Sequence, residues 1–279
     1  MRCNALAIFA AVEMGGASGN FARRLVQTWP KRVIPDTPVH KFPAPTAALL
    51  ADPANEYARD VKTALLIGAT GLVGSQLLGQ LLDDGRFGKV IAFGRKKTGQ
   101  SHPKLEDHVV DFDAPEAWSS LVKGDVAFSS LGTTRKQAGS LAAQKKVDYD
   151  YQLAFAKAAA SNGVGTYVLV SSSSADPTSK IFYTRIKGEL DRDVQQLGFE
   201  RVRIMRPSLL GGDRPQARAG EKIGSALLGA VNALGIARKY REIPGSVVAK
   251  AMTNAALDPE KGTRIYTLDE LFAEAESAR

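Results

Sequence analysis

The feature that most constrains the fold is a regular alternation of short apolar runs and helical patterns from Val61 onward. The apolar runs lie at 62–67, 89–93, 108–110, 126–129, 167–170 and 202–205. Helical patterns at 74–82, 146–161 and 183–197 separate several of them. Short apolar strands that alternate with helices indicate βαβ units, in which helices cover both faces of a parallel sheet. The sequence therefore predicts an α/β protein with a doubly wound parallel-sheet Rossmann fold of six strands.

A glycine-rich loop stands between the first predicted strand and the first predicted helix. Its sequence is Gly68-Ala69-Thr70-Gly71-Leu72-Val73-Gly74, a GxxGxxG pattern. Glycines permit a tight turn and let backbone N–H groups approach a pyrophosphate at the positive end of a helix. Because the loop lies between a strand and a helix, as such a site requires, we predict dinucleotide binding. The predicted contacts are Gly68, Thr70, Gly71, Leu72, Val73 and Gly74.

The end of the second predicted strand indicates which dinucleotide binds. An NAD-selective site places Asp or Glu there, which accepts hydrogen bonds from the ribose hydroxyls. This chain has Phe93-Gly94-Arg95-Lys96-Lys97 instead, with no acid. A guanidinium binds a 2′-phosphate through two hydrogen bonds, and a lysine adds a point charge. We therefore predict NADP(H), bound through Arg95 and Lys96, in preference to NAD(H). A solvated basic loop is the alternative interpretation.

Two further loops follow predicted strands at the same edge of the sheet. Asp111 and Phe112 follow the third strand, where the carboxylate would meet the adenine amino group. Leu131, Gly132 and Thr133 follow the fourth strand, where the backbone would pass close to the ribose. Both loops are predicted cofactor contacts, and ordinary turns at strand ends are the alternative.

Tyr183 and Lys187 form a YxxxK pair, which places both residues on one face of a predicted helix. An unperturbed tyrosine has a pKa of ~10, too high for ready proton exchange at neutral pH, and a neighbouring ammonium lowers that pKa. Such a tyrosine donates a proton to a carbonyl oxygen as hydride arrives. We predict that Tyr183 is the proton donor and that Lys187 tunes it and holds the nicotinamide ribose. A chance YxxxK pair is the alternative.

Four consecutive serines, 171–174, end the fifth predicted strand, a short distance before Tyr183. A hydroxyl at this place would hydrogen-bond the substrate carbonyl and orient it, whereas a serine-rich turn is the alternative interpretation. The combination favours the catalytic interpretation: a glycine loop after the first strand, serine after the fifth, and YxxxK on the next helix.

This order of motifs resembles that of the short-chain dehydrogenase/reductase superfamily. A narrower resemblance, from about Val61 to Leu271, is to an atypical branch. That branch is typified by the Tat-interacting-protein oxidoreductase-like family, which includes fungal proteins of the mitochondrial outer membrane. The matching segments are 68–74, Phe93-Gly94-Arg95, Val110-Asp111-Phe112, 130–135, Ser171-Ser172, 183–189, Arg206-Pro207, Gly212-Asp213-Arg214 and 243–252. The string Leu-Gly-Thr-Thr-Arg at 131–135 is the most specific of them.

The resemblance implies an NADPH-binding Rossmann fold with a small C-terminal substrate lobe. By position, Tyr183 and Lys187 match the catalytic pair of the family, and Ser172 matches its serine, with Ser173 as the alternative. Pro207 matches a position that lines the nicotinamide. The interval between the serine run and Tyr183 is short. This departure from the family's pattern affects the expected geometry of the site. Members of this branch are also often proposed to use the nucleotide for regulation or interaction.

The predicted domain organisation has two parts. Residues 1–60 form an N-terminal extension, because the segment up to residue 51 has six basic residues, two acids and five prolines. We expect a transit segment or a disordered extension there. Residues 61–279 form the NAD(P)-binding Rossmann domain, and 207–279 contribute the substrate lobe. Within that lobe, 212–243 would form a basic cover around the apolar stretch 223–237, which would suit a lipophilic or anionic substrate or peripheral membrane association. An ordinary packed helix with solvated ends is the favoured alternative interpretation of this stretch.

The net charge of +8 does not by itself indicate nucleic acid as a partner. The basic residues are scattered among acids, as in Asp191-Arg192-Asp193, whereas nucleic-acid binders cluster them. The single cysteine, Cys3, excludes an internal disulfide framework, and the three histidines lie far apart. We therefore expect no nucleic-acid partner and no metal site.

Two functions remain open from the sequence. The first is an NADPH-dependent oxidoreductase that reduces a small-molecule carbonyl substrate by hydride transfer, with Tyr183 as the proton donor. The second is a non-catalytic NADPH-binding regulatory or adaptor protein with a protein partner. A sugar-nucleotide epimerase would use the same three residues, but it needs a larger lobe than the chain after Pro207 offers. The expected location is intracellular, either cytoplasmic or mitochondrial.

Overall fold

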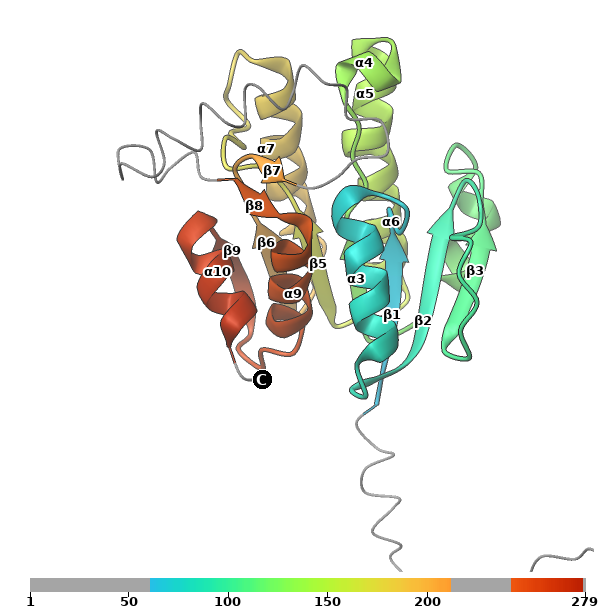
Figure 1. Cartoon of the computed structure of the whole chain (residues 1–279). Coiled ribbons are helices and arrows are strands. Elements are labelled where there is room, and N and C mark those ends of the chain that lie inside the picture. The colour runs from blue at the N-terminus through green and yellow to red at the C-terminus, as the bar shows by residue number, and fades with distance from the viewer. Residues whose placement is uncertain (1–60, 212–241, 278–279) are drawn as a thin grey trace, which may run out of the picture. The chain divides into compact units, whose positions relative to one another are not determined.

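Seven parallel strands form one sheet in the computed structural model, which describes residues 61–211 and 242–277 (Figure 1). The strand order across the sheet is β3-β2-β1-β4-β5-β6-β9. The strands are β1 (Lys62–Ile67), β2 (Phe87–Gly94), β3 (Leu105–Val109), β4 (Val126–Ser129), β5 (Thr166–Val170), β6 (Arg201–Met205) and β9 (Gly262–Tyr266). This confirms the doubly wound Rossmann fold, because the chain runs outward from β1 to β3 and then from β4 to β9.

The prediction of six strands was one strand short. The missed strand, β9, pairs with β6 at the edge of the sheet. Its first three residues are exposed, and only Tyr266 at its end is buried. A strand of this kind lacks the continuous apolar run by which the other strands were found. The third strand, β3, begins at Leu105 rather than at residue 108, because it too is only half-buried.

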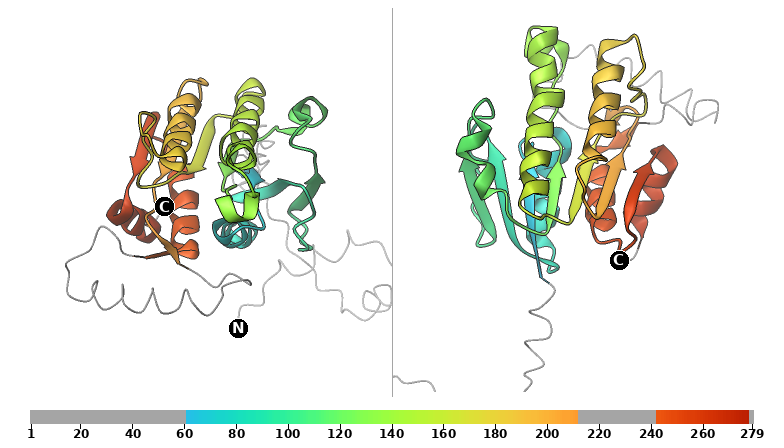
Figure 2. Two further views of the ribbon diagram at one scale, coloured as in Figure 1. Left: turned by 90° about the horizontal axis from the view of Figure 1, so that it is seen from above. Right: turned by 180° about the vertical axis from the view of Figure 1, so that it is seen from behind.

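Helices cover both faces of the sheet (Figure 2). One face carries α3 (Leu72–Asp83), α9 (Gly245–Ala256) and α10 (Leu268–Glu276), and the other carries α6 (Tyr151–Ser161) and α7 (Phe182–Val194). Shorter elements complete the connections: η5 (Pro115–Ala117), η6 (Ser119–Leu121), α4 (Arg135–Ala138), α5 (Leu141–Lys145) and the π-helical turn η7 (Lys146–Asp150). A separate two-stranded pair joins β7 (Leu210–Gly211) to β8 (Ile243–Pro244).

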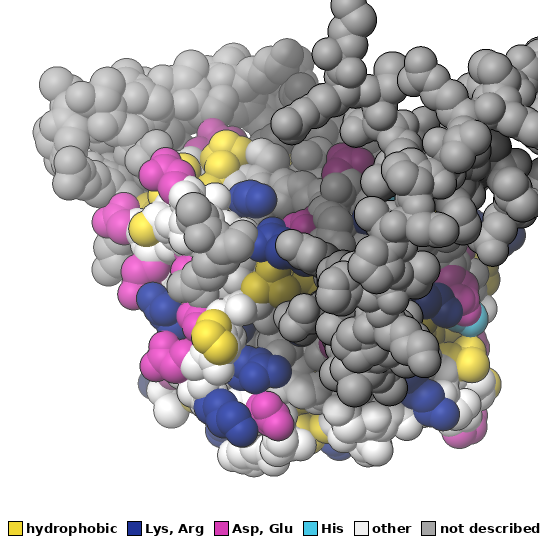
Figure 3. Space-filling view, turned by 90° about the horizontal axis from the view of Figure 1, so that it is seen from below, with side chains coloured by type: hydrophobic (Ala, Val, Ile, Leu, Met, Phe, Trp, Pro, Cys, Tyr) yellow, Lys and Arg dark blue, Asp and Glu magenta, His cyan; other side chains and the backbone are white. Residues whose placement is uncertain are grey.

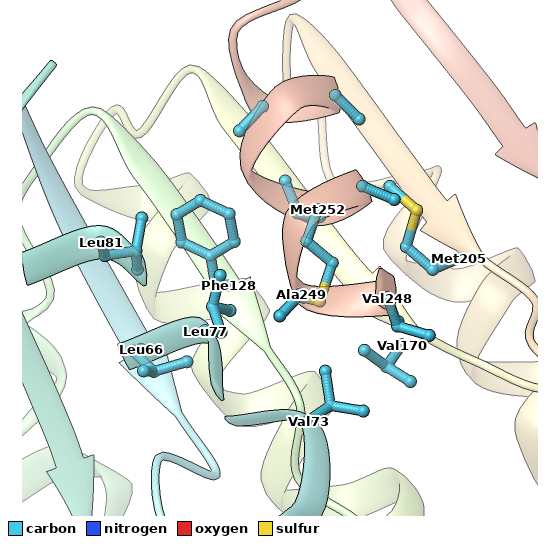
Figure 4. Close-up of a cluster of buried hydrophobic side chains, with 14 of the residues drawn as sticks. Leu66, Val73, Leu77, Leu81, Phe128, Val170, Met205, Val248, Ala249 and Met252 are labelled. Carbon is cyan, nitrogen blue, oxygen red and sulfur yellow. The ribbon is translucent and has the colours of Figure 1, made fainter. Parts of the chain in front are cut away.

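Two hydrophobic clusters fill the spaces between the sheet and its two helical layers. In the first, Leu77 and Leu81 of α3 face the sheet, as the helical pattern predicts, and Val248 and Met252 of α9 pack beside them (Figure 4). In the second, Phe155 of α6 is fully buried. The strands between the clusters are therefore apolar on both faces, which explains their continuous apolar runs.

The strand order reverses between β1 and β4, which are neighbours in the sheet although β2 and β3 lie between them in the chain. In open α/β sheets, ligands bind beyond the carboxyl ends of the strands at such a switch point. The loops that follow β1, β2, β3 and β4 all emerge at this edge. The predicted glycine loop, Arg95, Asp111 and Gly132 lie on these loops.

Two predicted regions, the N-terminal extension 1–60 and the part of the cover at 212–241, lie outside the described residues and stay predictions. Within 207–279, the described elements α9, β9 and α10 belong to the Rossmann layers themselves. None of the described helices combines the length and apolarity needed to span a bilayer. On the face in Figure 3, described basic side chains are interspersed with acidic ones.

Candidate functional site

The loop after β1 has the backbone geometry that close approach to a ligand requires. Gly68 has φ of 85°, a left-handed conformation that favours glycine, and the Gly71 N–H donates to the Gly68 carbonyl at 2.9 Å. The helix α3 begins at the next residue, Leu72. A Cβ on Gly74 would overlap the Gly68 carbonyl, so this position also requires glycine.

The same loop packs directly against the loop after β4. A Cβ on Gly68 would lie 2.6 Å from the Leu131 nitrogen, and the Ser130 hydroxyl donates to the Ile67 carbonyl at 3.0 Å. The two loops are therefore in contact at the switch point, beside the N-terminus of α3. The glycine loop 68–74 at this helix N-terminus, here called the glycine cradle, fits a dinucleotide pyrophosphate. Thr70 and Gly71 are exposed on it, whereas the side chain of Val73 is buried in the core.

Arg95 and Lys96 directly follow β2, and both are exposed. Arg95 lies close to Tyr151 of α6: burial and a hydrogen bond to Asp113 raise the pKa of Tyr151, and the charge of Arg95 opposes that rise. The cationic side chains therefore stand at the carboxyl edge, one strand away from the glycine loop. This position suits the adenosine end of a dinucleotide.

The loop after β3 presents the Asp111 side chain to solvent, whereas the side chain of Phe112 is not available to a ligand. Asp111 is exposed, and its carboxylate accepts a hydrogen bond from the Asp113 N–H at 2.9 Å. The Phe112 ring is buried at 5% exposure, where it stacks on Tyr151 and meets Trp118 edge to face. Only the backbone of Phe112 is thus available to an adenine.

The loop after β4 is held by a buried carboxylate that the sequence did not single out. Asp148 of η7 is 2% exposed, and its Oδ1 accepts a hydrogen bond from the Thr133 N–H at 3.3 Å. Its Oδ2 has no hydrogen-bond partner. Burial raises the pKa of Asp148, and the charge of Lys187 opposes that rise. Asp148 therefore connects the predicted ribose loop to the predicted catalytic lysine. The only sequence signal for it is its place on the helix that faces α7.

Tyr183 lies in the first turn of α7, and a side-chain hydrogen bond with Ser172 affects its ionisation. Partial burial and the negative charge of Asp148 raise the pKa of Tyr183 to about 12, whereas the Ser172 hydroxyl lowers it. The expectation of a lowered tyrosine pKa is therefore wrong for this structure. At neutral pH Tyr183 carries its proton, which is the form that a proton donor needs. Ser172 is half-buried and Ser173 is exposed.

Lys187 lies one turn further along α7 and is 3% exposed. Its Nζ donates to the Val170 carbonyl at the end of β5, at 3.1 Å. Burial lowers the pKa of Lys187, while the carboxylates of Asp148 and Asp191 oppose that effect. The lysine is thus fixed between the helix and the strand end that precedes the serine run.

A second buried carboxylate, Asp191, follows Lys187 by one more turn of α7 and is 2% exposed. It pairs with Arg206, whose Nε and second guanidinium nitrogen lie at 3.0 and 2.9 Å from its Oδ2. From the sequence, Asp191 was only one of the acids among which the basic residues are scattered; in the structure Arg192 pairs with Asp193, whereas Asp191 is buried. Its spacing of four from Lys187 was the signal that could have identified it.

The loops after β5 and β6 run side by side here. The Ser173 N–H donates to the Pro207 carbonyl at 2.9 Å, and Pro207 is buried beside Arg206. Ser172, Tyr183, Lys187 and Pro207 are thus brought to one edge of the sheet, the edge that also carries the glycine loop. Among residues 61–211 and 242–277, no group of three or more His, Cys, Asp or Glu residues is placed to hold a metal ion.

Comparison with known families and proteins agrees with this arrangement. A family model described as NAD(P)H-binding matches residues 68–227, from the glycine loop onward. The protein named FMP52, mitochondrial, of Coccidioides immitis is 33% identical over 223 residues, which cover 72% of this chain and 88% of that protein. The protein named HTATIP2 of Rattus norvegicus is 34% identical, with 72% of this chain and 84% of that protein covered.

Solved structures share the fold at lower sequence identity. A short-chain dehydrogenase/reductase superfamily protein from Agrobacterium tumefaciens with bound NAD superimposes with a TM-score of 0.56 at 18% identity and covers 74% of this chain and 77% of its own. A UDP-N-acetylglucosamine 4-epimerase from Methanobrevibacter ruminantium gives a TM-score of 0.57 at 16% identity, with 75% and 76% covered. These likenesses establish the shared Rossmann architecture.

Proposed function

Because this chain belongs to the NAD(P)H-binding family, as an atypical member of the short-chain dehydrogenase/reductase superfamily, we propose that it reduces a carbonyl compound with NADPH. The observation that carries the proposal is the meeting of Ser172, Tyr183 and Lys187 at the edge of the sheet that bears the glycine cradle. A nucleotide-binding fold implies a small-molecule ligand. The proposal goes further in naming a carbonyl compound as the substrate.

Tyr183 is the proposed proton donor. Its pKa of about 12 keeps the phenol protonated across the physiological range, so that it can hydrogen-bond a carbonyl oxygen and release its proton as negative charge develops there. Ser172, which interacts with the same phenol, orients the carbonyl.

Lys187 is the proposed source of positive charge beneath the tyrosine. It is buried and bonded to the Val170 carbonyl, so its position is set by the fold rather than by solvent. A fixed ammonium stabilises the charge that develops as the proton leaves Tyr183. NADPH, when bound, supplies the hydride.

The residues that would hold NADPH are the glycine loop, Arg95 and Lys96, and the loop at 131–133. Thr70 and Gly71 are exposed directly before the first turn of α3, so the glycine loop can be reached by a pyrophosphate at the helix N-terminus. The exposed Arg95, one strand away, suits a 2′-phosphate, whereas no acid follows β2 to favour NAD. These features support NADP(H) over NAD(H).

The non-catalytic adaptor is the less supported alternative, because the chain has all three residues of the proposed catalytic set, Ser172, Tyr183 and Lys187, at one edge of the sheet. The mitochondrial names of the fungal relatives support a mitochondrial location for this chain over a cytoplasmic one. The predicted transit segment within residues 1–60 agrees with that proposal.

The proposed activity is tested by comparing the full chain with its Tyr183→Phe variant in a screen of aldehydes and ketones, with NADPH oxidation followed by absorbance. We expect Tyr183→Phe to bind NADPH with unchanged affinity and to lose about 100-fold or more in kcat, since general acid catalysis contributes 10²–10⁴-fold. Tyr149→Phe is the matched control, because this tyrosine donates to Asp193 away from the serine run. Equal activity of wild type and Tyr183→Phe on every substrate reduced would overturn the proposal.

A further inference from the structure

Asp191 and Arg206 join the two halves of the site. Asp191 belongs to α7, which carries Tyr183 and Lys187, and Arg206 follows β6 and precedes Pro207. Two guanidinium nitrogens of Arg206 lie within 3.0 Å of one carboxylate oxygen of Asp191. The pair therefore fixes the catalytic helix against the strand end that bears a predicted nicotinamide contact.

Tyr183, Lys187 and Asp191 follow one another at intervals of four along α7, and so lie on the same side of the helix. Lys187 and Asp191 are both nearly inaccessible, at 3% and 2% exposure. The Oδ1 atom of Asp191 and the hydroxyl oxygen of Ser171 are buried without a hydrogen-bond partner of normal geometry. A charge in such a place has a strong effect on its neighbours, because little water screens it.

The charged groups that act on Lys187 are two carboxylates, Asp191 of α7 and Asp148 of η7. The same two carboxylates act on Tyr183, and Arg206, which follows β6, acts on Asp191. Burial raises the pKa of Asp191, whereas Ser171, Arg206 and Lys187 lower it. Asp191 thus provides one of two negative charges that offset the cost of burying the Lys187 ammonium.

We propose that Asp191, held in place by Arg206, is a positioning residue for the reaction, which keeps Lys187 charged and fixed at the end of β5, one turn along α7 from Tyr183. The catalytic role of Asp191 in this inference rests on the proposed function. Its effect on Lys187 is independent of any substrate, so the two can be tested separately.

The first test is a pH titration of the lysine Cε resonances in the full chain labelled with ¹³C-lysine, in which Lys187→Arg assigns the signal. We expect Asp191→Asn to lower the pKa of Lys187 by about one unit, since an opposite charge at close range shifts a pKa by 1–3 units. Asp191→Glu should restore the wild-type value. The matched control is Asp193→Asn, which removes a carboxylate that pairs with Arg192 and has a 20% exposed side chain.

Should Asp191→Asn fail to fold, Asp191→Ser, which removes the same charge with a smaller side chain, provides the same test with the same sign. The pKa of Lys187 should again fall, whereas Arg192→Gln, which removes a charge from the exposed side of the same helix, should leave it unchanged. An unchanged Lys187 pKa in every folded variant that removes the Asp191 charge would overturn the proposal.

The second test concerns catalysis. In Asp191→Asn, the alkaline limb of the kcat profile for carbonyl reduction should move to lower pH with the Lys187 pKa, while the affinity for NADPH stays within about twofold. An unmoved limb alongside a shifted Lys187 pKa would refute the positioning role in catalysis. If wild type reduces no carbonyl, the proposed function fails, whereas the lysine titration still decides whether Asp191 keeps Lys187 charged.

Discussion

Asp148 is the residue on which the electrostatics of the site most depend. It is buried beside Lys187, it raises the pKa of Tyr183, and it accepts the Thr133 N–H of the predicted ribose loop. A carboxylate buried with one oxygen unpartnered costs free energy, and such groups cluster at functional sites. The same side chain therefore acts on the tyrosine, the lysine and the cofactor loop.

Replacing Asp148 with Asn should lower the pKa of Tyr183 below its value of about 12. Asn keeps an acceptor for the Thr133 N–H but removes the negative charge that opposes the phenolate, and we expect a shift of about one unit. The measurement is the pH titration of phenolate absorbance, taken as the difference between each protein and its Tyr183→Phe counterpart. Asp150→Asn is the control, because Asp150 pairs with Lys145 at the half-exposed end of η7. A Tyr183 midpoint that is the same with and without the Asp148 charge would show that this carboxylate does not set it.

At the scale of single residues, the sequence predicted those candidate site residues that form a recognisable motif. Tyr183, Lys187 and the serine run could be found because they lie close together along the chain and in a recognisable order. The sequence did not show what Asp148, Asp191 and Arg206 do, because their importance comes from burial and from partners on other elements. The residue type alone does not show whether an aspartate is buried or exposed.

The element that carries the chemistry, α7, is held in place by a glycine as well as by the Asp191–Arg206 pair. Gly188 is buried on the side of α7 that touches the turn after the serine run, and a Cβ there would overlap the backbone of Asp176 and Pro177. The Asp176 N–H also donates to the Thr184 carbonyl at 3.1 Å. The helix can therefore approach the serine loop only with glycine at this position.

Gly188→Ala should destabilise the protein and displace α7 from the serine loop. We expect a loss of about 1–3 kcal/mol in the free energy of unfolding, since overpacking against backbone costs that much, together with a fall in kcat. Gly79→Ala in α3 is the control: nothing lies within 4 Å of its Cβ, so alanine should stabilise that helix by about 0.5–1 kcal/mol. Urea unfolding of both variants is the measurement. Equal stability of the two variants would contradict the close approach.

The elements themselves could be predicted where they are buried and regular. The strands β1, β4, β5 and β6 match the predicted apolar runs to within one residue, because both of their faces are covered. The edge strand β9 was missed because its exposed residues carry no apolar pattern. The π-helical turn η7 was included in a longer predicted helix, because one extra residue in a turn leaves the apolar periodicity almost unchanged.

At the scale of the whole molecule, one edge of the sheet collects everything that the proposed reaction needs. The glycine cradle and Arg95 lie on loops that follow β1 and β2, and the proposed catalytic side chains lie beyond β5 and on α7. Because the strands are parallel, the loops that follow them lie at the same edge of the sheet. Motifs that are far apart in the sequence are therefore brought together there. The part of the predicted substrate lobe at 212–241 lies outside the described residues and stays a prediction.

The central claim is that this edge binds NADPH through the glycine cradle and Arg95. Its most direct test is a calorimetric titration of the full chain with NADPH and with NADH, on wild type and on Arg95→Ala. Lys123→Ala is the control, because it removes an exposed cation at the opposite edge, just before β4. The account predicts that wild type binds NADPH more tightly than NADH, and that Arg95→Ala weakens NADPH binding by about 10- to 100-fold while NADH binding is unchanged. Equal affinities for the two nucleotides in wild type, or no binding of either, would contradict it.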